Sequence, residues 1–208
     1  MEQFEYRGYS FEVQNEGGTM TQSQYQKMID LLEENRPVEI IEFGCGQSTI
    51  IFEKYIGKYK GNLISIEQDA GYKRKDTVVF PVVEPGKLVI GNKEYGKCNY
   101  YDGLEDFLKE RNVKYDFISI DGPIGCGFRE YFEYGRVQLL DFAILDLMKD
   151  KCIVQIHDAQ RVNMRNTYTE FEKILKEKGY VWSVEEIGSG NNNPALLRVY
   201  SISRKIVL

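Results

Sequence analysis

A glycine turn directly after an apolar run is the first place in this sequence where a ligand could be held. The run at residues 38–43, VEIIEF, leads into Gly44-Cys45-Gly46, and the residues after it can begin a helix. Glycine lets backbone N–H groups approach a ligand closely, and the first turn of a helix offers further free N–H groups. We therefore expect a cradle for a nucleotide-like ligand, made by Gly44, Gly46, Gln47 and Ser48. The alternative is a tight strand-to-helix turn that holds no ligand.

Two glutamates flank the turn in positions that suit an adenosine ligand. Glu42 stands just before Gly44, and Glu67 ends a second apolar run in the string NLISIEQD. A carboxylate at the end of the second strand can accept hydrogen bonds from both ribose hydroxyls, and about 20 residues is the usual separation from the turn. Gln68 follows directly and could assist. The alternative for Glu67 is a solvated strand end.

A third acid, Asp102, lies in the string NYYDGLEDFL, just before a predicted helix. It could accept a hydrogen bond from an adenine amine. It could equally be a helix N-cap, and one aspartate can do both.

Charge at the turn favours one kind of cofactor over another. The third glycine of a dinucleotide fingerprint would fall at Thr49, where it is absent. Glu42 would repel a diphosphate but attract an amino group or a sulfonium. We therefore expect S-adenosylmethionine rather than NAD. A nucleotide-sugar or NAD oxidoreductase, and a cofactor-binding module without turnover, remain as alternatives.

A second group of polar residues follows two later apolar runs. Asp121 ends DFISID, and His157-Asp158 ends CIVQIHD. Open α/β sheets place ligands at the carboxyl ends of their parallel strands, so these residues should meet at one edge. His157, the only histidine in the chain, can take the proton of a hydroxyl acceptor, with Asp121 or Asp158 orienting the ring. Two alternatives are a structural histidine and a divalent metal held by Asp121, His157 and Asp158.

Arginines gather in the sequence around these strand ends and could clamp a carboxylate of the acceptor. Those we assign to acceptor binding are Arg129, Arg136 and Arg161. The alternative for each is a surface or helix-capping cation.

The elements that must position these residues alternate between strand and helix. Strands are expected at 38–43, 63–67, 115–121 and 152–157, with closing strands at 180–185 and 196–202. Capping-box pairs, Thr21 with Gln24 and Thr167 with Glu170, predict two helix starts. This order predicts a single Rossmann-like α/β domain whose mostly parallel sheet of about seven strands has helices on both faces and an antiparallel C-terminal edge. Residues 1–36 would be an N-terminal extension and helix, and residues 38–208 the cofactor-binding core.

Composition excludes several classes of partner. The net charge of -5 argues against a non-specific grip on nucleic acid. No apolar run has the length of a membrane span, and the first residues lack the order of a signal peptide. The 4 cysteines form no CxxC pair, which fits reduced thiols and a cytoplasmic location. The sequence does not indicate an oligomeric state.

The strings EFGCG, SIEQD, YYDGLEDFL, YDFISIDGP and IVQIHDAQR, in this order over about residues 38–185, resemble the class I S-adenosylmethionine-dependent methyltransferases. Within them, IDGPIG, YGRVQLLDFAIL and IHDAQR are similar to the plant glucuronoxylan 4-O-methyltransferase family. That resemblance implies O-methylation of a saccharide or another small hydroxyl acceptor, with a uronic acid as one candidate. The string EFGCGQS departs from the plant form and is closer to general bacterial methyltransferases.

Overall fold

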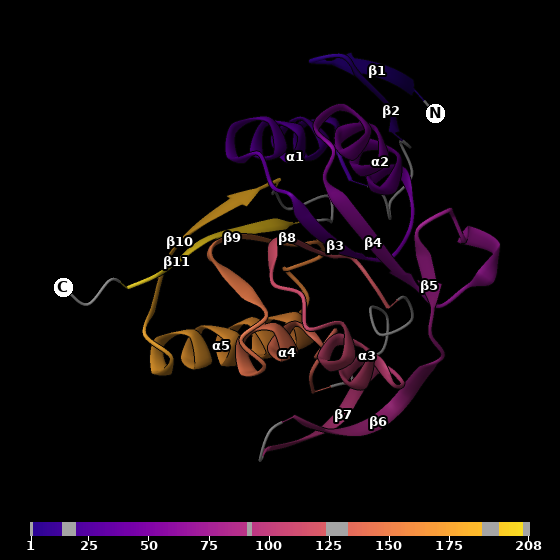
Figure 1. Ribbon diagram of the computed structural model, residues 1–208. Helices are drawn as coiled ribbons and strands as arrows, with labels where there is room; N and C mark the ends of the chain where they lie inside the picture. The colour runs from indigo at the N-terminus through magenta and orange to yellow at the C-terminus, as the bar shows by residue number, and fades with distance from the viewer. Residues whose placement is uncertain (1, 14–19, 91–92, 124–132, 189–195, 206–208) are drawn as a thin grey trace.

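A seven-stranded sheet forms the centre of the molecule in the computed structural model, which describes residues 2–13, 20–90, 93–123, 133–188 and 196–205 (Figure 1). The strands lie in the order β10–β11–β9–β8–β3–β4–β5. Their bounds are β3 Glu39–Phe43, β4 Asn62–Glu67, β5 Thr77–Val79, β8 Tyr115–Ile120, β9 Met148–Ile156, β10 Tyr180–Ile187 and β11 Leu197–Arg204. The five strands from β9 to β5 are parallel, and β11 is antiparallel to both of its neighbours. The predicted mostly parallel sheet is confirmed, but the last strand inserts beside β9 and leaves β10 at the edge.

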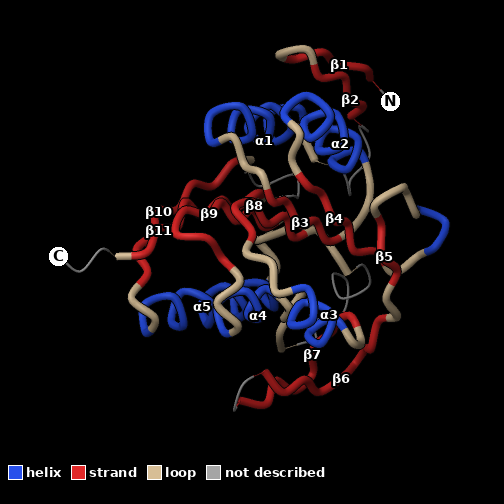
Figure 2. The backbone as a smooth tube through the Cα atoms, viewed as in Figure 1, coloured by secondary structure: helices blue, strands red, loops and turns tan. Residues whose placement is uncertain are grey.

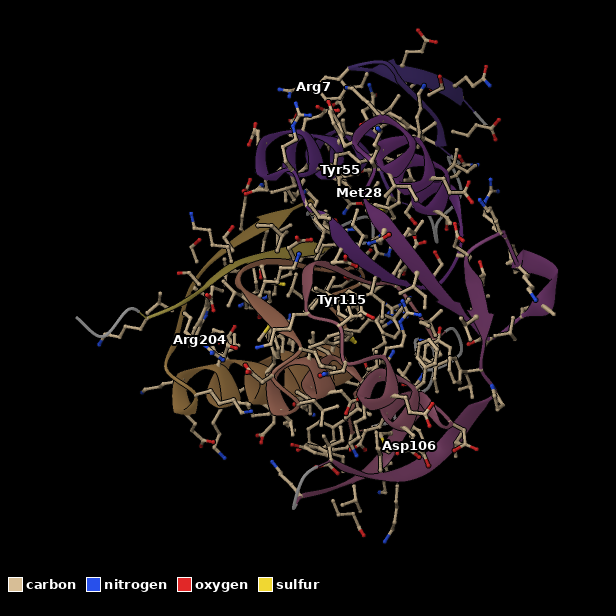
Figure 3. All side chains as sticks on the ribbon, viewed as in Figure 1. Arg7, Met28, Tyr55, Asp106, Tyr115 and Arg204 are labelled. Carbon is tan, nitrogen blue, oxygen red and sulfur yellow. The ribbon has the colours of Figure 1, made fainter. Side chains whose placement is uncertain are left out.

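Helices cover both faces of the sheet, as predicted. Helices α1 (Gln22–Asn35) and α2 (Gln47–Tyr59) lie on one face, and α3 (Leu104–Arg111), α4 (Leu139–Ile144) and α5 (Val162–Glu177) lie on the other (Figure 1). Side chains alternate along each buried strand, so Ile40 packs into one apolar core and Ile41 into the other. Figure 3 shows Met28 and Tyr55 between the sheet and the first pair of helices.

Two hairpins lie outside the sheet (Figure 2). The first, β1 (Glu2–Tyr6) with β2 (Tyr9–Val13), packs on α1 and α2, where the hydroxyls of Tyr9 and Tyr59 both donate to Glu33. The second, β6 (Val82–Ile90) with β7 (Lys93–Tyr101), leads into α3 on the opposite side. A single 3₁₀ turn, Ala70–Tyr72, connects β4 to β5.

One of the two predicted capping boxes is confirmed. The Thr21 hydroxyl accepts from the backbone N–H of Gln24, whose side chain accepts in return from the N–H of Thr21. The predicted start at Thr167 is wrong, since α5 begins at Val162 and the Thr167 hydroxyl donates to the carbonyl of Gly135 at 2.7 Å. None of the helices in the described ranges is long and apolar enough to cross a membrane.

Candidate functional site

A cleft of about 550 Å³ opens beside the glycine turn. Its walls are residues 44–48, residues 71–74, Asp121, and two residues from the N-terminal part of the chain, Met20 and Tyr25. This volume is within the range of small-molecule sites. The cleft lies at the carboxyl ends of β3 and β8, where an open α/β sheet places its ligands. A smaller hollow of about 250 Å³, lined by Pro37 and Asp116, lies at the opposite ends of these strands.

The turn itself needs glycine at one position and leaves open space at another. Gly44 has φ +89°, and a Cβ there would lie 3.0 Å from the backbone nitrogen of Gly122. Gly44 therefore lets the ends of β3 and β8 approach each other. A Cβ on Gly46 would meet no atom of the described residues within 4 Å. The N–H of Gly46 donates to the Thr49 hydroxyl at 2.9 Å, so the residue in place of a third glycine serves to start α2.

The carboxylate of Glu42 lies behind the turn and does not line the cleft, contrary to the sequence-based expectation of direct cofactor contact. Glu42 is fully buried, and its two oxygens accept from the hydroxyls of Ser48 and Ser65. Burial raises the pKa of Glu42 to about 7, and the hydroxyl donors offset only part of this effect. Ser48 does line the cleft, so any influence of Glu42 on a ligand passes through that hydroxyl.

Glu67 is also turned inward, which corrects its expected position in the cleft. Its carboxylate accepts from the backbone N–H groups of Cys45 at 2.7 Å, Gln68 at 2.6 Å and Asp69 at 3.0 Å, and only 2% of the residue is exposed. Both oxygens are thereby bonded to the main chain. In this conformation Glu67 joins the glycine turn to the end of β4 and does not line the cleft.

Asp102 stands at the end of β7, exposed and outside the cleft lining. The N-cap of α3 is Gly103, with φ +77°, so neither the N-cap alternative nor a cleft position for Asp102 is met. Gln47 and Ser48, by contrast, line the cleft as expected.

The second predicted group does come together at the ends of β8 and β9. The Nδ1 atom of His157 lies 3.0 Å from Oδ1 of Asp121 and 3.9 Å from Oδ2 of Asp158. His157 is 3% exposed, and its Nε2 has no hydrogen-bond partner among the described residues. Asp121 also lines the cleft, so one carboxylate connects the glycine turn to the histidine.

Burial and charge oppose each other in this pair, and charge prevails. Burial disfavours ionised His157, yet the carboxylates of Asp121 and Asp158 raise the histidine pKa. Burial likewise disfavours ionised Asp121, but His157, Arg136 and Arg161 lower the pKa of that carboxyl. In both residues the neighbouring charges therefore favour the ionised form more than burial disfavours it.

The three arginines that the sequence assigned to acceptor binding differ in where they lie. Arg136, which the sequence assigned to acceptor binding, is 3% exposed. Its Nη1 donates to the carbonyl of His157 at 2.7 Å, and its Nη2 lies 3.2 Å from Asp121 and 3.3 Å from Asp158. The guanidinium is thus enclosed by the strand ends and does not line the cleft, so acceptor binding by Arg136 stays a prediction. Arg161, partly exposed, pairs with Asp158 at 2.7 Å, and Arg129 lies outside the described residues.

A divalent metal does not fit this arrangement. The candidate ligand atoms of Asp121, His157 and Asp158 all lie within 4.8 Å of one another, a spacing that would suit an ion. However, Oδ2 of Asp158 already accepts from two guanidinium groups, and Oδ1 of Asp121 accepts from one. The charge that a metal would neutralise is therefore already neutralised by arginine.

Sequence reasoning missed the contribution of the N-terminal helix and of residues 71–74 to the cleft. Tyr25 fell on the apolar face of a helix and gave no other signal, but it lines the cleft near Asp121. Burial, together with the charges of Asp121 and Glu42, raises the pKa of Tyr25. Tyr72 is 58% exposed at the rim.

Comparison with known proteins gives a fold and no close relative. No family model and no curated protein match the sequence. The structure is similar to an O-methyltransferase from Bacillus cereus in complex with SAH, with TM-score 0.54 and 11% identity over 88% of this chain and 82% of that one. It is also similar to an SAH-bound methyltransferase from Podospora anserina, with TM-score 0.55 and 14% identity over 90% of this chain and 80% of that one. The chain shares the Rossmann-like α/β fold of these proteins. In this shared fold the cleft beside residues 44–48 lies at the carboxyl ends of the parallel strands.

Proposed function

We propose that this protein is an S-adenosylmethionine-dependent methyltransferase that methylates a hydroxyl oxygen on a saccharide or another small acceptor. One observation carries the proposal: Asp121 lines the cleft beside the glycine turn and also holds the ring of His157. A cofactor cleft and a candidate base are thereby joined through one side chain. The likeness to SAH-bound methyltransferases supports the cofactor, and the strings IDGPIG and IHDAQR support a sugar hydroxyl.

The cleft offers groups for each part of the cofactor. Its methionine end would lie against Gly44, Gly46 and Ser48, where backbone and hydroxyl groups are available. Its adenosine would lie toward residues 71–74, where the ring of Tyr72 offers an apolar face. When bound, S-adenosylmethionine supplies a methyl group activated by a positively charged sulfur. Glu42, behind Ser48, favours positive charge at this end whenever it is ionised.

His157 would accept the proton that the acceptor must lose. The Asp121 carboxylate holds Nδ1–H, which leaves Nε2 as the atom that takes a proton. Nε2 would take the hydroxyl proton as the acceptor oxygen is methylated, while Asp121 would hold the ring in place. A positioned base of this kind contributes about 10²–10⁴-fold in rate. Because carboxylates raise the His157 pKa, turnover should rise with pH until the ring is neutral.

Two measurements test the proposal. Calorimetry should show binding of S-adenosylmethionine to the whole chain, and release of S-adenosylhomocysteine should follow when uronic acids and neutral sugars are screened as acceptors. His157→Gln should lose about 10²–10⁴-fold in turnover while binding the cofactor normally. A folded protein without cofactor binding would refute the methyltransferase assignment, and unchanged turnover in His157→Gln would remove His157 as the base.

A further inference from the structure

Two carboxylates and a histidine converge at the ends of β8 and β9, and a cation is already among them. Nη2 of Arg136 lies 3.2 Å from Oδ1 of Asp121 and 3.3 Å from Oδ2 of Asp158. Nη1 of the same guanidinium donates to the main-chain carbonyl of His157. The group is therefore bonded to all three of the residues that could otherwise hold a metal ion.

The fold fixes this guanidinium from several directions. Arg136 has φ +49°, and its N–H donates to the buried side chain of Asn99 on β7 at 2.9 Å. The preceding residue, Gly135, donates to the carbonyl of Asn163 on α5 and accepts from the Thr167 hydroxyl. A backbone held between β7 and α5 places the cation without help from a ligand.

Formal charges balance at this edge of the sheet. Asp121 and Asp158 contribute two negative charges, and Arg136 and Arg161 contribute two positive charges. A divalent ion bound to these carboxylates would lie close to the buried guanidinium of Arg136. The two cations would repel each other strongly, because the surroundings have low polarity. The carboxylates therefore lack the uncompensated charge that attracts a metal.

We propose that Arg136 is the resident cation of the site and takes the place of a divalent metal beside Asp121 and Asp158. This proposal goes beyond the methyltransferase assignment and does not depend on it, because it concerns only which cation these carboxylates bind.

Manganese binding tests the replacement directly. Free Mn²⁺ is measured by electron paramagnetic resonance in titrations of the full chain, without cofactor or acceptor. The native protein should bind no Mn²⁺ in the micromolar range. Arg136→Met keeps an unbranched side chain but removes the charge, and this variant should bind about one Mn²⁺ per chain. The double variant Arg136→Met with Asp158→Asn should lose that binding. Arg136→Lys restores the charge and should again bind none.

Each outcome decides the question. Stoichiometric Mn²⁺ in the native protein, lost in Asp158→Asn, would overturn the proposal. So would a folded Arg136→Met that binds no Mn²⁺, because the vacated site should then attract a cation. Arg136→Gln provides a second neutral variant if circular dichroism shows that the methionine variant is unfolded, and the native titration does not depend on any variant. Calorimetry with S-adenosylmethionine separately reports on the methyltransferase assignment.

Discussion

Acidic side chains lie in two neighbouring regions of the molecule, and their pKa values shift in opposite directions. Beside the glycine turn, Glu42 is surrounded by neutral hydroxyls, and burial raises its pKa to about 7. At the ends of β8 and β9, Asp121 is partly exposed to the cleft and lies beside His157 and two arginines, whose charges lower its pKa. The difference shows that the extent of burial and the charge of the hydrogen-bond donors together set ionisation.

This contrast in charge fits the proposed function, in which one region binds the cofactor and the other accepts a proton. A cofactor that brings its own positive charge is better met by a carboxylate that has no resident cation. The proton-accepting edge instead keeps fixed ion pairs, which hold the histidine ring in one orientation. Four changes test this comparison, in order of decreasing expected effect.

Breaking the ion pairs should be the most damaging change. Asp158→Ala would leave Arg136 buried with one carboxylate partner fewer, and we expect a loss of about 3–5 kcal/mol in the free energy of unfolding. Urea denaturation measures this. Glu94→Gln, which removes an exposed ion pair with Lys87, is the control and should change stability by less than about 0.5 kcal/mol. Equal losses in the free energy of unfolding for the two variants would show that the buried ion pairs stabilise the protein no more than the exposed pair does.

Glu42→Gln should change how stability depends on pH. Since the pKa of Glu42 rises from 4.5 unfolded to about 7 folded, the native state favours the protonated form. Its contribution is fully present below pH 4.5 and is lost as pH rises through 7. The glutamine variant lacks this loss. The difference in free energy of unfolding between the variant and the native protein should therefore shift by about 3 kcal/mol in favour of the variant from pH 4 to pH 8. Parallel stability curves from pH 4 to 8 would mean that Glu42 is not perturbed.

Gly122 follows β8 and contacts the glycine turn at Gly44, and we expect that it cannot be replaced by a residue with a side chain. A Cβ there would lie 2.2 Å from the buried Tyr101 hydroxyl and 2.9 Å from the nitrogen of Gly44. Gly122→Ala should cost about 1–3 kcal/mol and weaken cofactor binding, because the glycine turn must move. Gly57→Ala, exposed in the last turn of α2 with open space around its Cβ, is the matched control and should not destabilise the protein. A stable Gly122→Ala with normal cofactor affinity would contradict the contact.

The exposed rim should show the smallest effect. Tyr72→Ala should leave stability unchanged and weaken S-adenosylmethionine binding by about 1 kcal/mol through lost aromatic contact. Calorimetry measures the affinity, and Tyr72→Phe should retain it. If both variants bind as the native protein does, the adenosine does not lie against residues 71–74.

Much of the fold follows from local patterns that the sequence displays openly. Period-two and period-3.6 apolar residues give the order of strands and helices, and the glycine turn after residues 38–43 marks one wall of the cleft. The pair Thr21 and Gln24 makes a capping box as expected, because both partners of that motif lie within one helical turn. The juxtaposition of Asp121 with His157 also follows, since the carboxyl ends of adjacent parallel strands share one edge.

The sequence could not determine the direction in which each polar side chain points or the partner to which it bonds. Thr167 and Glu170 show the same local pattern as Thr21 and Gln24, yet Thr167 lies inside α5 and bonds to Gly135, 32 residues away. Glu67 binds the main chain of the glycine turn, and Arg136 is enclosed between strands that are distant in sequence. A buried polar group must satisfy its hydrogen bonds with whatever donors the packed chain brings within reach, and only the tertiary structure sets that choice.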